Sequence, residues 1–431
     1  MEYYPLRRSL NIGFISTRLA GTDGVSLETT KWAEVLEMIG HKCFYFSGLS
    51  DRPDDVSMVV PEAYYRHPDV EYRHAGFFGT DRRTPEDTEW IHDWRVTFKN
   101  HLYDFINQFE LDILIPENLF AIPLQIPLAL ALTEVIAETG IPTIAHHHDF
   151  AWERKRFLVN GIEDYLASSF PPELPSIQHV VINSQGRSAL ARRRGVSSVI
   201  IPNVMHYEKQ PIGIDDYSAD LRQTLGIRED EIFILQPTRV VQRKGIEHAI
   251  ELVQRLDRDA VLVISHASGD EGDEYEQRLQ EYARLLNVRT LFCDEHFDEY
   301  RRTSPDGQKI YGLNDAYPHA DLVTYPSVFE GFGNAFLEAV YFKKPIVVNN
   351  YSIYATDIRP LGFQVVEFDD YVTEETVAHT ERILDNPDLV NEMVETNYQL
   401  AMQFFSYRVL WRNLDILIAN ISGTRPMFAL D

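Results

Sequence analysis

Residues 233–265 read FILQPTRVVQRKGIEHAIELVQRLDRDAVLVIS. The stretch opens with a short apolar run, passes through a loop into an amphipathic segment at 246–256, and ends in a second apolar run at 260–265. Short apolar runs that alternate with amphipathic segments are typical of parallel strands joined by crossover helices. This stretch therefore predicts an α/β fold.

The same alternation continues in both directions along the chain. Further predicted strands lie at 11–16, 43–46, 112–116, 142–146, 179–182, 198–202, 321–325 and 345–349. Residues 204–220 contain Pro211, Gly213 and three aspartates, and they form the predicted linker. We therefore predict two doubly wound, Rossmann-like domains, 1–205 and 206–405, which face a central ligand cleft at the carboxyl ends of their strands. The charged stretch 53–88 is predicted to be an irregular insertion or an extended surface hairpin.

The composition indicates which classes of partner are disfavoured and in which compartment the protein is expected. The formal net charge is −26, which disfavours nucleic acid and anionic lipid surfaces, so a phosphate-bearing ligand would need a local cationic pocket. Cys43 and Cys293 lie in apolar runs and predict two buried free thiols in a reducing compartment. No apolar leader is visible, and the apolar stretch 120–137 is interrupted by prolines and polar residues. We therefore expect a cytoplasmic protein without a membrane span.

Two cations border the start of the helix predicted at 246–256. Arg239 follows the strand at 233–236, and Lys244 comes five residues later. A guanidinium can chelate two oxygens, an ammonium adds a point charge, and the free N–H groups of a helix start add donors. These residues predict a diphosphate site, although an exposed arginine and lysine on a solvated loop remain the alternative.

A second group of residues follows the strand at 321–325, where residues 326–339 read PSVFEGFGNAFLEA. Glu330 lies in the loop, and Glu338 falls eight residues later in the predicted helix, so both can border one ligand. Carboxylates that accept hydrogen bonds from hydroxyls suit a sugar or a ribose. Gly331 and Gly333 would let main-chain N–H groups approach an anion. The alternative for Glu338 is a residue that complements the helix dipole.

Together these motifs resemble a known family. Pro-Thr-Arg, Arg-Lys-Gly and, about 90 residues later, Pro-Ser-x-x-Glu-Gly-Phe-Gly-x-x-x-x-Glu-Ala are similar to the pattern of the retaining glycosyltransferases of family 4, whose fold is GT-B. The resemblance implies that residues 406–431 cross back to pack on the first domain. It also implies an enzyme that moves a hexose from a nucleoside-diphosphate sugar to a small soluble hydroxyl acceptor.

The resemblance implies roles for particular residues of this chain. Arg239 and Lys244 would hold the diphosphate, Glu330 would contact the donor sugar, and Glu338 would accept the ribose hydroxyls. Main-chain donors would come from the loop that contains Gly331, Phe332, Gly333 and Asn334. His148 and Asp149 match the family's His-Asp pair, in which the histidine faces the donor sugar.

The loop at 21–24 corresponds in place to the glycine loop of the family but lacks its adjacent glycine pair. Gly24 is the best match for a donor contact. The candidate acceptor contacts are Arg18, Asp23, Glu117 and Asn118.

Two features could suggest a metal site, and we favour neither as one. Residues 146–148 are consecutive histidines, but neighbours on an extended segment point to alternating sides, and the sequence offers no matching cluster of ligands. Residues 257–259 read Asp-Arg-Asp, in a turn-like setting between a helix and a strand. We expect a metal-independent enzyme with no cofactor beyond its nucleotide-sugar co-substrate.

Part of the chain is similar to a narrower group within the family. Residues 13–18, 23–27 and 148–154 are similar to synthases of mannosylglucosylglycerate-type compatible solutes. This similarity implies a donor of the GDP-mannose or UDP-glucose type and a glucosylglycerate-like acceptor. The alternatives are a retaining disaccharide phosphorylase, a nucleotide-sugar epimerase of the same fold, or a non-catalytic nucleotide-sugar-binding protein, and a homodimer is left open.

Overall fold

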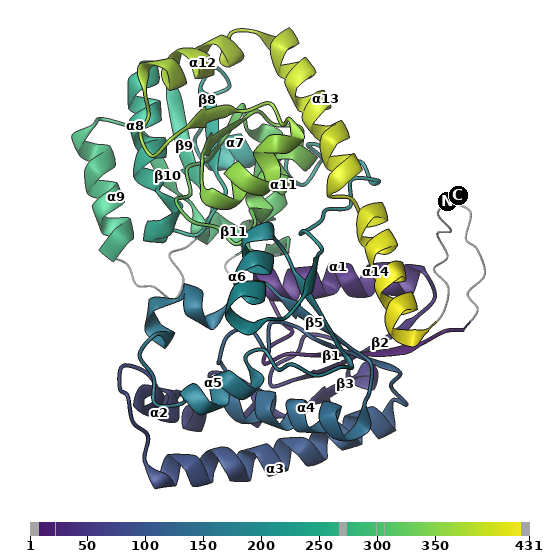
Figure 1. Ribbon diagram of the computed structural model, residues 1–431. Coiled ribbons are helices and arrows are strands. Elements are labelled where there is room, and N and C mark those ends of the chain that lie inside the picture. The colour runs from purple at the N-terminus through teal and green to yellow at the C-terminus, as the bar shows by residue number, and fades with distance from the viewer. Residues whose placement is uncertain (1–7, 22, 267–273, 299, 306, 424–431) are drawn as a thin grey trace. The chain divides into compact units, whose positions relative to one another are not determined.

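The computed structural model describes residues 8–21, 23–266, 274–298, 300–305 and 307–423 (Figure 1). The chain forms two compact units. Unit 1 comprises Met1–Val204 together with Tyr407–Asp431, and unit 2 comprises Met205–Ser406. The two boundaries between the units each lie one residue away from those expected from the sequence.

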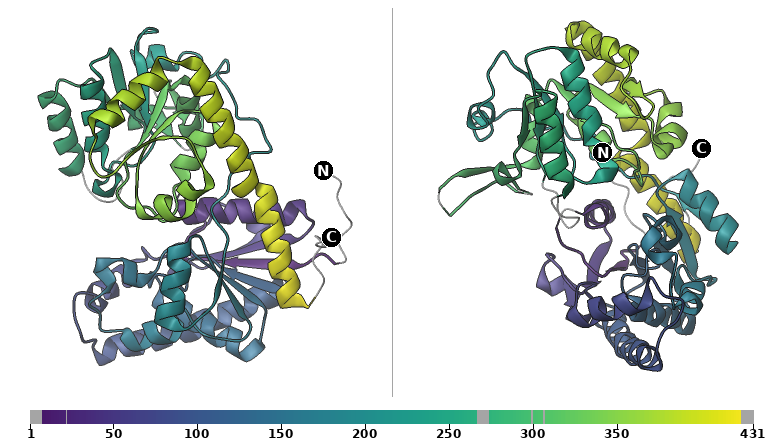
Figure 2. Two further views of the ribbon diagram at one scale, coloured as in Figure 1. Left: turned by 45° about the horizontal axis from the view of Figure 1, so that its top comes forward. Right: turned by 90° about the vertical axis from the view of Figure 1, so that its left-hand side faces the viewer.

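Unit 1 is built on a seven-stranded parallel sheet in the order β3-β2-β1-β4-β5-β6-β7. The strands are β1 (Asn11–Ile15), β2 (Lys42–Ser47), β3 (Ser57–Val59), β4 (Ile113–Pro116), β5 (Thr143–His147), β6 (Ile177–Val181) and β7 (Ser198–Ile200). The helices are α1 (Gly24–Met38), α2 (Pro68–Phe77), α3 (Pro85–Gln108), α4 (Ile126–Thr139), α5 (Glu163–Ser169), α6 (Ser184–Arg194) and α14 (Tyr407–Ser422). Helices α3 and α4 lie over one face of the sheet and α1 and α14 over the other (Figure 2), and each pair belongs to a separate apolar core.

Unit 2 is built on a six-stranded parallel sheet in the order β10-β9-β8-β14-β15-β16. The strands are β8 (Ile232–Gln236), β9 (Ala260–Ile264), β10 (Thr290–Phe292), β14 (Leu322–Tyr325), β15 (Ile346–Asn349) and β16 (Val366–Phe368). The helices are α7 (Leu221–Thr224), α8 (Ile246–Leu256), α9 (Glu274–Leu285), α10 (Ala316–His319), α11 (Asn334–Tyr341), α12 (Glu374–Leu384) and α13 (Pro387–Phe404). A small sheet joins β11 (Phe297–Asp298), β13 (Lys309–Gly312) and β12 (Arg302–Thr303). The two parallel sheets confirm the predicted α/β architecture of two Rossmann-like domains.

The interpretation of residues 53–88 as an irregular insertion or surface hairpin was wrong. The segment contributes β3 to the edge of the main sheet, forms α2, and begins α3. Helix α3 begins at Pro85 because Thr84 accepts a hydrogen bond from the Asp87 N–H and Asp87 in turn accepts one from the Thr84 N–H. Short elements with few buried residues show little periodicity of apolar residues. The charged composition of the segment therefore favoured an irregular structure in the sequence analysis.

The first helix, α1, begins after a capping aspartate, although Ser26 is also a residue type that caps helices. Asp23 caps α1, because its Oδ1 accepts hydrogen bonds from the N–H groups of Val25 at 3.1 Å and Ser26 at 3.3 Å. Ser26 instead lies inside the first turn and donates its hydroxyl to Asp23 Oδ2 at 2.6 Å.

Two other features agree with expectation. Cys43 and Cys293 are buried free thiols, and burial raises the pKa of both. Among the residues that the structure describes, no helix combines the length and the apolar character that a membrane crossing requires.

Helix α14 is part of the core of unit 1 although it lies at the far end of the sequence. Leu410, Leu414 and Leu417 are at most 1% exposed and join Trp32 of α1 in one apolar cluster. The Tyr407 hydroxyl donates a hydrogen bond to Glu34 on α1 at 2.6 Å. The helix therefore completes one face of unit 1, beside α1 (Figure 1).

We expect Leu414→Ala to lower the free energy of unfolding by about 2–5 kcal/mol, because it removes a fully buried side chain and leaves a cavity. Ile416→Ala on the same helix is the control, since Ile416 is 38% exposed and its loss should change stability by less than about 1 kcal/mol. Urea unfolding measures both variants. Equal effects would contradict the burial of this helix face.

A buried histidine pair links β5 and β6. His147 Nε2 and His179 Nδ1 lie 2.9 Å apart, and the rings are stacked. One nitrogen donates and the other accepts, so the geometry requires at least one neutral ring. Burial lowers the pKa of His179 to about 4 and that of His147 well below its usual value.

Acidification should therefore destabilise unit 1. Above about pH 6.5 the histidines are neutral in both states, whereas between about pH 6.5 and 4 the unfolded chain binds protons that the folded chain excludes. For each histidine that stays neutral in the folded state, the free energy of unfolding is lower by about 2 kcal/mol at about pH 5. We expect His179→Gln to lose less stability between about pH 7.5 and 5 than the wild type, and exposed His92→Gln to lose as much as the wild type. Urea titrations at both pH values measure this difference, and parallel curves for His179→Gln would refute it.

Candidate functional site

Two loops of unit 2 pack together at the carboxyl ends of the adjacent strands β8 and β14. The Val328 N–H donates to the carbonyl of Arg243 at 2.9 Å. Gly245 has φ +57°, and a Cβ there would lie 2.5 Å from the Pro326 carbonyl oxygen. A glycine is therefore required where the loop after β8 meets the loop after β14.

This packing brings cations and a carboxylate into one cluster. Lys244 Nζ forms an ion pair with Glu330 Oε1, and Arg243 Nη1 lies 3.1 Å from Glu330 Oε2. Lys244 is 8% exposed and Glu330 is 7% exposed. Burial lowers the pKa of Lys244 against the opposing effect of Glu330. Burial alone would raise the pKa of Glu330, but Lys244 and Arg243 outweigh it and hold that pKa below its usual value.

Arg239 and His266 lie near the same cluster. Arg239 is exposed, and its charge acts on His266 together with that of Lys244. Burial, helped by these two cations, lowers the pKa of His266 to about 4. Arg243 and Lys244 both pair with one carboxylate, Glu330, and the charge of Arg239 acts on Lys244 nearby, which leaves a local surplus of positive charge. An anion is the ligand that this surplus favours.

The glycine-rich loop after Glu330 is fixed by a tyrosine. The Tyr351 hydroxyl donates to the Phe332 carbonyl at 2.7 Å. Gly333 has φ +133°, and a Cβ there would lie 2.4 Å from the same hydroxyl oxygen. Glycine is therefore required at 333 both for its backbone conformation and for the close approach of Tyr351. Asn334 is the first residue of α11.

Glu338 lies on α11, half-buried, and its Oε2 accepts a hydrogen bond from the Tyr317 hydroxyl at 2.7 Å. Because α11 begins at Asn334, Glu338 lies beyond the first turn, where the helix dipole acts most strongly. The alternative explanation of Glu338 as a dipole partner is therefore weakened.

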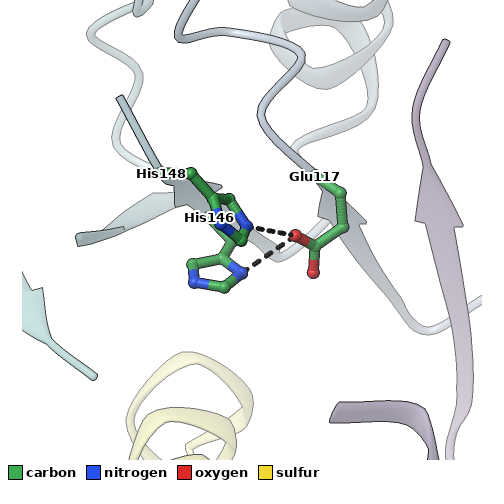
Figure 3. Close-up of side chains that lie close together, drawn as sticks. All are labelled: Glu117, His146 and His148. Atoms are coloured by element: carbon green, nitrogen blue, oxygen red, sulfur yellow. Dashed lines mark hydrogen bonds and ion pairs between the residues drawn. The ribbon is translucent and has the colours of Figure 1, made fainter. Parts of the chain in front are cut away.

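Unit 1 holds a second cluster, at the ends of the adjacent strands β4 and β5 (Figure 3). Glu117 Oε2 lies 2.9 Å from His146 Nδ1 and 3.3 Å from His148 Nε2. Burial raises the pKa of Glu117 to about 7, an effect that His148 opposes, and it lowers the pKa of both histidines. The expectation that the histidines lack a matching ligand cluster was wrong. His146 and His148 share one side of the extended chain, and a carboxylate from the next strand meets them there.

The three donor atoms of Glu117, His146 and His148 lie within 4.8 Å of one another, so the group could hold a metal ion. The two distances to the shared carboxylate oxygen are also ordinary hydrogen-bond lengths. Hydrogen bonding therefore accounts for the contacts of Glu117 Oε2, whereas Glu117 Oε1 and His146 Nε2 are buried without a hydrogen-bond partner among the described residues.

Asn118 ties the loop after β4 to the His148–Asp149 segment. Its Oδ1 accepts the His148 N–H at 2.9 Å, and its Nδ2 donates to Asp149 Oδ1 at 2.9 Å. Asn118 adopts φ +55°, a conformation that asparagine tolerates better than most residues. Arg154 forms an ion pair with the other oxygen of Asp149. The backbone of His148 and the carboxylate of Asp149 are thus both held in place.

The loop before α1 carries the remaining predicted residues. Arg18 pairs with Asp23 at 2.8 Å and lies over the Tyr65 ring, 5.7 Å from its centroid. Gly24 begins α1, and a Cβ there would meet nothing within 4 Å. The position of Gly24 therefore imposes no local need for glycine, and Thr22, in the same loop, lies outside the described residues.

The structure adds several residues that the sequence interpretation left out of the site. Arg243 stands inside the Arg-Lys-Gly motif and could have been included on that ground. His146 could have been joined to Glu117 if the register of β4 and β5 had been known. Tyr317, Tyr351 and His266 come from distant segments, and their spacing carries no signal.

Comparisons with known proteins agree on the family. The family model described as "Glycosyl transferases group 1" matches residues 218–400. The mannosylglucosylglycerate synthase of Thermotoga maritima is 32% identical over 92% of this chain and 97% of its own length. The mannosylglucosylglycerate synthase of Petrotoga mobilis is 33% identical over 83% of this chain and 86% of its own length.

A solved glycosyltransferase from Rickettsia africae ESF-5 shares the fold. Its TM-score is 0.69 at 15% sequence identity, and the match covers 97% of this chain and all of that one. The chain therefore belongs to the group 1 glycosyltransferases of GT-B fold, among which it is similar over most of its length to mannosylglucosylglycerate synthases.

Proposed function

We propose that the chain is a retaining, metal-independent hexosyltransferase that transfers mannose from GDP-mannose to a glucosylglycerate-like acceptor. The observation that carries the transfer chemistry is the cluster in unit 2, where Lys244 and Arg243 pair with the buried Glu330 and the charge of Arg239 acts on Lys244. The similarity to two mannosylglucosylglycerate synthases supports the choice of donor and acceptor.

In this proposal the diphosphate of the donor binds Arg239 and Lys244. Departure of the sugar leaves negative charge on the diphosphate, and fixed cations stabilise that charge without reorganising. Glu330 holds Lys244 in place and contacts the donor sugar. The N–H groups of the loop at 331–334 meet the phosphate, and Glu338, which is held by Tyr317, accepts the ribose hydroxyls.

His148 and Asp149 contact the donor sugar in the same proposal, with Gly24 close to the phosphate. Retention follows from front-side attack, in which the leaving phosphate accepts the proton of the acceptor hydroxyl. Because protein cations neutralise the leaving group, the proposed reaction uses no metal ion.

The acidic acceptor is assigned to Arg18, whose guanidinium can bind a carboxylate and is already beside Asp23. Glu117 and Asn118 are less suited to direct acceptor contacts than the sequence predicted. Both are buried, and their side chains already bond to the His148–Asp149 segment.

The function is tested by offering GDP-mannose, UDP-glucose and an ADP-sugar to the protein with glucosylglycerate or glycerate, and by analysing the products by mass spectrometry and NMR. We expect acceptor-dependent addition of one hexose from GDP-mannose, with the anomeric configuration of the donor retained and activity unchanged in EDTA. A phosphate-dependent sugar phosphate, an epimerised nucleotide sugar, or hydrolysis that the acceptor does not increase would contradict the proposal.

Lys244→Ala should weaken the binding of GDP-mannose by about 10- to 100-fold, because a charge-assisted hydrogen bond to phosphate contributes about 1.5–3 kcal/mol. Calorimetry measures the affinity. Lys343→Ala is the control, because Lys343 pairs with Glu395 at the surface and should leave the affinity unchanged. An unchanged affinity in Lys244→Ala would remove Lys244 from the diphosphate site.

A further inference from the structure

The proposed function uses His148 but leaves its neighbours Glu117 and His146 without a role. One oxygen of Glu117 serves both histidines, at 2.9 Å from His146 Nδ1 and 3.3 Å from His148 Nε2 (Figure 3). Glu117 and His146 are each 1% exposed. A carboxylate buried this deeply is costly, so its contacts with the two rings call for an explanation.

The surroundings hold the cluster still. The Trp32 ring stacks on His146 with the ring centroids 4.2 Å apart. Glu28, which is 1% exposed, acts on both His146 and Glu117 through its charge and is paired with Lys31 at 2.6 Å. No arginine or lysine of the described residues pairs with Glu117. The two imidazole rings are therefore its hydrogen-bonding partners.

Those contacts dictate where the protons lie. An ionised carboxylate only accepts hydrogen bonds, so each histidine donates to it. His146 is then protonated at Nδ1 and His148 at Nε2, and each neutral ring keeps its other nitrogen as an acceptor. The side chain of His148 is 9% exposed, against 1% for that of His146. His148 is thus the ring of the pair that reaches the surface, with Nδ1 able to accept a hydrogen bond.

We propose that Glu117 is a positioning residue for sugar transfer. Its shared oxygen fixes the ring orientation and tautomer of His148, so that His148 Nδ1 accepts a hydrogen bond from a hydroxyl of the donor sugar. His146 is the second donor, and it keeps the carboxylate oxygen in place beneath His148. This inference rests on the proposed function, because it requires that His148 contact the donor sugar.

Glu117→Leu and Glu117→Gln test the proposal at about pH 8, where the carboxyl group of the wild type is ionised. Leucine removes the acceptor, whereas glutamine keeps an acceptor oxygen of similar shape. We expect Glu117→Leu to lower kcat by about 10- to 100-fold, the usual cost of removing a group that orients a functional histidine, with the KM for donor and the affinity for GDP little changed. Glu117→Gln should recover part of the loss.

Asp87→Asn is the matched control. Asp87 is another buried carboxylate of unit 1, but it binds Arg73 and accepts the N–H of Thr84, the N-cap of α3. Its replacement should lower stability and leave kcat unchanged. A kcat loss equal to that of Glu117→Leu would mean that removal of any buried acid in this unit slows transfer, and would overturn the proposal.

A double-mutant cycle with His148→Ala separates this inference from the proposed function. If Glu117 acts through His148, Glu117→Leu costs nothing further in the His148→Ala background. Additive losses would overturn the positioning role while leaving His148 in the site. A wild-type kcat in His148→Ala would instead remove His148 from the proposed function, and the inference with it.

NMR of protein labelled with ¹⁵N-histidine supplies a reading independent of activity. At about pH 8, where Glu117 is ionised, we expect His146 in the Nδ1–H form and His148 in the Nε2–H form, and we expect Glu117→Leu to abolish the Nδ1–H preference of His146. The opposite tautomers in the wild type, or a stoichiometric metal ion in the purified protein, would overturn the proposal.

Discussion

All strands of the two main sheets run parallel, and the placement of every candidate functional residue depends on this constraint. A parallel strand must be followed by a crossover, so the loops that leave the strands gather at the same edge of each sheet. Lys244 follows β8 and Glu330 follows β14, and these strands are neighbours although the two residues are 86 positions apart in sequence. The strand order alone therefore brings Lys244 and Glu330 together.

Much of this architecture can be predicted from the sequence, because buried parallel strands are continuous apolar runs and amphipathic helices separate them. That Lys244 and Glu330 belong to one group could also be predicted, since both lie in motifs with a distinctive order. In a chain of net charge −26 a local group of cations stands out. Each run or motif consists of residues that are close together in sequence, so short sequence patterns are enough to predict these features.

Two kinds of feature could not be predicted. Some depend on contacts between segments that are distant in sequence, and others depend on which of two neighbouring residues, both suited to a role, takes that role. Asp23 and Ser26 are both good N-caps, and only the backbone conformation shows that Asp23 is the cap. The pairing of Glu117 with His146 and His148 depends on the adjacency of β4 and β5, which strand order decides. Tyr317 reaches Glu338 from another helix, and nothing in their spacing marks the pair.

The two units use the same physical device with different chemistry. In each, a carboxylate that follows one strand holds a basic group that follows the adjacent strand: Glu330 with Lys244, and Glu117 with His148. Burial raises the cost of leaving either partner alone, so each pair is retained in one arrangement. In unit 2 two cations pair with the carboxylate and the charge of Arg239 acts on one of them, so positive charge is in surplus. In unit 1 the partners are neutral rings, so the carboxylate determines proton positions rather than charge. In the proposed function the first arrangement suits the stabilisation of a diphosphate, and the second suits the recognition of a sugar hydroxyl.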